Sequence, residues 1–137
     1  MGSFAVFADG TANLPQSLLD GISLLPLEYT VDGRPNCYTG DLDRFDAHTY
    51  YEGLRQGRSV QTSLVNTHAF LQAFEPVLKN GTDLVYVSMS SAISGTCHAA
   101  ETAAKELTET YPDRFVHVVD SLGCGFGGGL LAIRPRN

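Results

Sequence analysis

Short apolar runs alternate with amphipathic segments along most of the chain. The apolar runs end at polar or glycine-containing turns, a pattern typical of buried strands. One such turn is Asp32-Gly33, which follows the second run. We expect four strands, at residues 4–8, 22–31, 84–87 and 115–119.

The segments between these runs have apolar residues at helical spacing. We expect helices at residues 11–20, 43–56, 67–78 and 93–110. Asn13 is a candidate N-cap for the first helix, and Asn66 or Thr67 for the third, which Asn80-Gly81 ends. The last helix has a small apolar stripe that suits close packing on a sheet, formed by Ala100, Ala103, Ala104 and Leu107.

Strands that alternate with helices predict an α/β fold: a mostly parallel sheet with helices on both faces. We expect a single domain over residues 1–137. Ligands of such sheets bind beyond the carboxyl ends of the strands. The polar segments in those places are residues 9–11, 88–96 and 120–121.

Composition excludes several classes of protein. The chain is 43% hydrophobic and carries a net charge of -6, and no two Lys or Arg residues are adjacent, so nucleic acid is not an expected partner. No apolar run approaches the roughly 20 residues that a membrane span needs, and the N-terminus lacks the features of a signal peptide. Three widely spaced cysteines form no CxxC pair. These features favour a reducing cytoplasm.

The segment from Ser88 to Thr96 joins an expected strand to an expected helix. It brings several hydroxyl groups and Gly95 to a helix N-terminus, where free N–H groups and the helix dipole favour an anion. Ser91 or Ser94 as a simple helix cap is the alternative interpretation, and the more common one for serine.

Thr62 and Ser63 precede another expected helix and add two hydroxyls that can donate to an acid group, although a cap or turn is again the more common role. Neither hydroxyl segment has an adjacent Lys or Arg. Such a site suits a singly charged carboxylate better than a polyphosphate.

Other candidate sites have weaker support. Residues 123–129 contain GxGxxG-like spacing, but the acidic residue expected about 20 positions later would lie beyond residue 137, so we expect no dinucleotide cofactor. The four histidines match no metal motif, and Cys97 is more typical of a packed small residue than of a nucleophile. We therefore expect no catalytic residue and no metal.

The chain resembles the DegV family through five segments that occur in the family's order. The Thr-Ser pair and the Ser-Gly-Thr turn are the most specific of them. The segments are Asp9-Gly10-Thr11-Ala12-Asn13-Leu14-Pro15, Pro26-Leu27, Thr62-Ser63, Ser90-Ser91-Ala92-Ile93-Ser94-Gly95-Thr96 and Asp120-Ser121.

This resemblance implies a protein that binds a long-chain fatty acid and presents it to a fatty acid kinase. By position, Thr62 and Ser94 would hydrogen-bond the carboxylate, and Ser63, Gly95 and Thr96 would shape the pocket. The chain departs from the family pattern at Gly10, where a serine is usual, and at Cys97 and His98, where an aromatic residue and an amide are usual. These departures bear on the acyl specificity.

Members of the family are about twice as long and have a second, C-terminal domain. The resemblance thus implies that residues 1–137 are a truncated form consisting of the N-terminal domain only. Pro135 would break a helix that continues in the family. An isolated lobe would expose apolar surface and self-associate.

The expected function is therefore non-catalytic binding of a fatty acid. Two alternatives remain open. One is a phosphotransferase component resembling dihydroxyacetone kinase, and the other is a regulatory or interaction fragment without a ligand.

Overall fold

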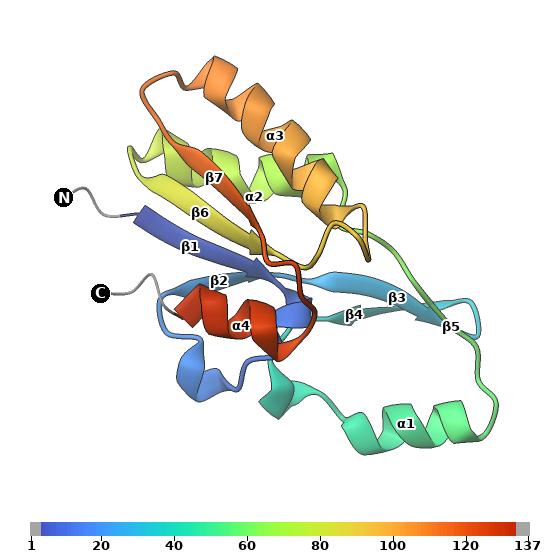
Figure 1. Ribbon diagram of the computed structural model, residues 1–137. Helices are drawn as coiled ribbons and strands as arrows, with labels where there is room; N and C mark the ends of the chain where they lie inside the picture. The colour runs from blue at the N-terminus through green and yellow to red at the C-terminus, as the bar shows by residue number, and fades with distance from the viewer. Residues whose placement is uncertain (1–3, 134–137) are drawn as a thin grey trace.

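A parallel sheet forms the centre of the molecule in the computed structural model, which describes residues 4–133 (Figure 1). Its strands lie in the order β2-β1-β6-β7. The strands are β1 (Phe4–Asp9), β2 (Ile22–Leu25), β6 (Asp83–Ser88) and β7 (Val116–Asp120). The two central strands, β1 and β6, carry apolar residues on both faces, as expected for a sheet covered on both sides.

Helices cover both faces of this sheet (Figure 1). On one face, α2 (Thr67–Lys79) and α3 (Thr96–Thr110) pack over Phe7, Leu84 and Tyr86. On the other face, α4 (Phe126–Ile133) buries Ala132 against Val6 and Ala8. The predicted α/β architecture is confirmed.

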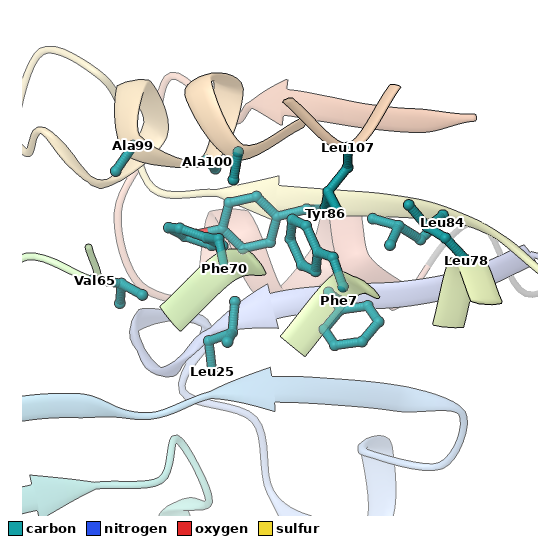
Figure 2. Close-up of a cluster of buried hydrophobic side chains, with 12 residues drawn as sticks. Phe7, Leu25, Val65, Phe70, Leu78, Leu84, Tyr86, Ala99, Ala100 and Leu107 are labelled. Atoms are coloured by element: carbon teal, nitrogen blue, oxygen red, sulfur yellow. The ribbon is translucent and has the colours of Figure 1, made fainter. Parts of the chain in front are cut away.

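Aromatic side chains form the larger of the two cores (Figure 2). Phe70 and Phe74 of α2 are fully buried against Tyr86 of β6. Their ring centroids lie 5.0 Å and 5.8 Å from that of Tyr86, and the Phe74 ring lies 5.2 Å from that of Phe7. These separations fall within the range of favourable ring pairs. The core thus ties α2 to the centre of the sheet.

A second, antiparallel sheet in the order β4-β3-β5 was not expected. Its strands are β3 (Leu27–Val31), β4 (Arg34–Tyr38) and β5 (Val60–Thr62), and α1 (Ala47–Arg55) lies beside it, away from α2 and α3 (Figure 1). The expected single strand at 22–31 is therefore wrong. Pro26, which has no N–H to donate to a ladder, separates β2 from β3.

The first expected helix, at 11–20, is also wrong. Two 3₁₀ turns, Gly10–Ala12 and Gln16–Leu18, occupy this region. Asn13 does not cap a helix N-terminus; it ends the first turn in the left-handed region with φ of 49°. Asparagine tolerates this conformation better than most residues because its side chain can hydrogen-bond locally.

Two other helices begin later than expected. A 3₁₀ turn, Leu42–Arg44, precedes α1, and Asp46 caps α1 by accepting from the Thr49 N–H at 3.0 Å. The expected helix at 93–110 begins at Thr96, because residues 90–94 form a turn closed by the Ile93 and Ser94 amides on the Ser90 carbonyl.

Several local predictions are confirmed. Asn66 caps α2, accepting from the Ala69 N–H at 2.9 Å, and the alanine stripe of α3 is buried.

Gly129 has a packing role: a Cβ there would lie 2.6 Å from the Ala12 carbonyl oxygen. The glycine lets α4 approach the first turn closely. Pro135 lies outside the described residues.

Candidate functional site

Asp9, the last residue of β1, holds together the carboxyl edge of the parallel sheet. Its side chain is 1% exposed. Its carboxylate accepts from the Tyr86 hydroxyl at 2.9 Å and from the Met89 N–H at 3.0 Å. It also accepts from the backbone and the hydroxyl of Thr11. Asp9 therefore fixes the start of the loop that follows β6.

The Tyr86 hydroxyl is a neutral donor to Asp9 in this network. Burial raises the pKa of Tyr86 far above its ordinary value, and the neighbouring Asp9 carboxylate adds to the shift. The phenol therefore keeps its proton at all physiological pH values and continues to donate it to Asp9.

The loop after β6 is also attached to the segment after β7. Ser91 donates to the Asp120 carboxylate through its hydroxyl at 2.5 Å and its N–H at 3.2 Å. The Ser90 N–H donates to the Gly123 carbonyl at 2.9 Å. The hydrogen bond from Ser91 lowers the pKa of Asp120 below its ordinary value, so the carboxylate stays ionised and keeps accepting.

The Ser94 and Thr96 hydroxyls form a pair at the N-terminus of α3. Their oxygens are 3.0 Å apart, and Ser94 Oγ also accepts from the Thr96 N–H at 3.2 Å. The Ser94 hydroxyl is the donor of this pair, and Thr96 Oγ1 accepts both from it and from the Val65 N–H. Thr96 is fully buried and Ser94 half-buried, so a ligand at this edge would reach Ser94, whose hydroxyl would turn from Thr96 Oγ1 to donate to it.

The segment that follows β5 packs against this hydroxyl pair. The Val65 N–H donates to Thr96 Oγ1 at 3.2 Å, and a Cβ on Gly95 would lie 3.3 Å from Leu64 Cδ2. Thr62 and Ser63 are exposed and lie within three residues of Val65. Their Cα atoms are therefore within about 11 Å of the Val65 Cα.

Ser94, Gly95 and Thr96 thus lie together at the start of α3. Thr62 and Ser63 lie on the segment after β5 that packs against them. Within residues 4–133 no hydrogen bond links the side chains of Thr62 and Ser94. The interpretation of Ser94 as the helix cap is wrong, because Gly95 is in the N-cap position of α3 and no side chain caps the helix there. Ser94 Oγ instead accepts from the first amide of α3, that of Thr96.

Sequence reasoning missed the role of Tyr86. The side chain lies inside a strand, 77 positions from Asp9, and no local pattern links the two residues. Asp9 and Asp120 could be recognised in the sequence, because each is a carboxylate directly after an apolar strand. Their hydrogen-bond partners could not be recognised in this way.

The remaining candidates have structural roles. Cys97 is 1% exposed and its thiol pKa is raised by burial, so it is an unreactive packed residue. In the part of the chain that the structure describes, no group of three or more His, Cys, Asp or Glu residues is arranged to hold a metal ion. No helix among these residues has the length and apolarity needed to cross a membrane.

Comparison with known proteins places this geometry in a family. A family model described as an uncharacterised protein of the DegV family matches residues 3–136. A DegV domain-containing protein of Clostridium perfringens is 35% identical over 137 residues, covering 96% of this chain and 45% of the relative. A relative in Streptococcus pyogenes is 31% identical over 133 residues, with 96% and 46% covered. The chain thus spans about half the length of these curated relatives.

Solved structures share the fold. A Thermus thermophilus DegV protein described by its fatty acid binding has a TM-score of 0.81 at 26% identity, covering 96% of this chain and 45% of that one. A Thermotoga maritima protein described as revealing fatty acid binding function has a TM-score of 0.80 at 25% identity, with 97% and 48% covered. The Streptococcus pneumoniae fatty acid kinase B3 protein, loaded with linoleic acid, has a TM-score of 0.74 at 23% identity, with 95% and 46% covered.

Proposed function

The chain belongs to the DegV family, and on that premise we propose that it holds a long-chain fatty acid by its carboxylate. In this proposal Ser94 and Thr62 donate hydrogen bonds to the carboxylate. Ser63, Gly95 and Thr96 shape the pocket around it. The fatty acid binding described for the Thermus and Thermotoga proteins supports the same ligand class here.

The hydroxyl pair at the start of α3 is the observation that carries the proposal. Thr96 anchors both the Val65 backbone and Ser94 Oγ, so the segment bearing Thr62 and the segment bearing Ser94 are held together. The positive end of the α3 dipole adds a preference for a negative group at this position.

Exposed apolar side chains near this edge supply a surface for the acyl chain. They occur in the segments after β5, β6 and β7 and in α4, and comprise Leu64, Ile93, Leu122 and Phe126, each at least 51% exposed. Covering them with acyl methylenes would contribute about 0.8 kcal/mol per buried CH₂. The carboxylate contacts would then set the orientation of the ligand.

The wider assignments follow from the same premise. We assign residues 1–137 to the first of the family's two domains, with the second domain covering the acyl chain. The protein would bind the acid without transforming it, in the cytoplasm, and present it to a fatty acid kinase. Wherever the second domain does not cover it, the exposed apolar surface would promote self-association.

Native mass spectrometry of the chain purified from bacterial cells tests this function. The parent is expected to carry a fatty acid, and the double variant Thr62→Ala/Ser94→Ala to bind it at least about 100-fold more weakly. The factor follows from the loss of two hydrogen bonds to a charged group.

The matched control is Ser17→Ala/Thr102→Ala, which removes one serine and one threonine hydroxyl at exposed positions away from the site. This control should keep the lipid content of the parent. Equal lipid content in the parent and in the Thr62/Ser94 double variant would refute the proposed contacts.

A further inference from the structure

A cavity lies between α1 and the antiparallel sheet, with a volume of about 720 Å³. Its lining comes from β3, β4, β5, α1 and the adjoining turns, and includes no residue of the 88–96 loop. Its size is within the range of small-molecule sites. The cavity is therefore a candidate site distinct from the hydroxyl pair.

Aromatic rings form one wall of this cavity. The Tyr29 and Tyr50 centroids are 5.9 Å apart with the rings nearly perpendicular, and the Phe45 centroid lies 5.3 Å from that of Tyr50. All three residues line the cavity. Such rings present faces and edges that suit a flat apolar group.

The charged side chains that line the cavity differ in their ion-pair and hydrogen-bond partners. Asp32 accepts from the Ser59 N–H at 2.9 Å and lies 4.0 Å from the Arg58 guanidinium. Asp46 caps α1, where the helix dipole offsets its charge, and the Thr49 hydrogen bonds lower its pKa.

Arg34 differs from these groups. Among residues 4–133 no carboxylate lies within ion-pair distance of its guanidinium. The lining carries two acids and two arginines and has no net charge, but Arg34 is the one of these four groups without an ion pair or side-chain hydrogen bond among residues 4–133. A guanidinium binds a planar anion such as a carboxylate or sulfonate well.

We infer that this cavity binds an organic monoanion with a flat apolar body. Arg34 binds the charged group, and Tyr29, Phe45 and Tyr50 contact the body. Polar side chains, among them Asn36 and Thr49, interrupt the apolar lining. This mixture favours a ring system with polar substituents over a long acyl chain.

Fluorescence titration with 8-anilinonaphthalene-1-sulfonate, a flat monoanion, tests the inference on the purified chain. The parent is expected to bind the dye in a saturable manner, and Arg34→Gln to bind about tenfold more weakly, the effect of losing one charge-assisted hydrogen bond. Arg34→Lys should keep part of the affinity. Arg55→Gln is the matched control, because Arg55 is on α1, pairs with Glu52 at 3.3 Å and does not line the cavity.

A parallel titration distinguishes this site from the proposed fatty acid site. Oleate should not displace the dye, and Ser94→Ala should leave dye binding unchanged while weakening oleate binding. No saturable binding to the parent, displacement by oleate, or equal affinity of parent and Arg34→Gln would each overturn the inference. The fatty acid proposal is tested separately, by the weaker binding of oleate to Ser94→Ala.

Discussion

Replacing Asp9 with alanine is expected to lower the free energy of unfolding by about 3 kcal/mol. The change leaves the Tyr86 hydroxyl and the Met89 N–H without their acceptor. Each buried donor without a partner costs about 1–3 kcal/mol. Because Met89 begins the loop that carries Ser94, we also expect weaker fatty acid binding.

Urea denaturation followed by circular dichroism measures this loss. Asp113→Ala is the control, since Asp113 is exposed and such substitutions usually change stability by less than about 0.5 kcal/mol. Tyr86→Phe removes only one donor and should have a smaller effect than Asp9→Ala. If Asp9→Ala unfolds at the same urea concentration as Asp113→Ala, the carboxylate does not hold this edge of the sheet together.

Phe74→Ala is expected to destabilise the chain by about 3–5 kcal/mol, the usual cost of deleting a buried aromatic ring. Phe74 is fully buried and contacts the rings of Phe7, Phe70 and Tyr86. Its removal leaves a cavity between α2 and the centre of the sheet.

Thermal unfolding of Phe74→Ala should show a large drop in Tm relative to Phe115→Ala. Phe115 is 73% exposed, so its truncation removes the same group without opening a cavity. Similar Tm values for the two variants would show that the aromatic cluster does not determine the stability of this fold.

The parallel sheet and its helices could be predicted because their patterns are local. The apolar runs of β1 and β6 and the spacing of Phe70, Phe74 and Leu78 in α2 are visible in the sequence. The antiparallel sheet could not be predicted in the same way. Strand β4 is largely exposed and contains Pro35, so it lacks the alternation that identifies a strand.

The residues of the candidate site could be predicted from their types and positions, but the contacts that hold them in place could not. Hydroxyls before and at a helix start identify Thr62, Ser63, Ser94 and Thr96 as candidates. The contact of Val65 with Thr96 joins positions 31 residues apart, and that of Tyr86 with Asp9 joins positions 77 apart. Such contacts depend on the packing of whole elements, which no local pattern specifies.

A crystal structure of the chain grown with palmitate tests the central claim most directly. The account predicts the carboxylate at the N-terminus of α3, with its oxygens within about 3.2 Å of Ser94 Oγ and Thr62 Oγ1. A carboxylate bound elsewhere, for instance at Arg34, with both hydroxyls free of contact to the ligand, would contradict it.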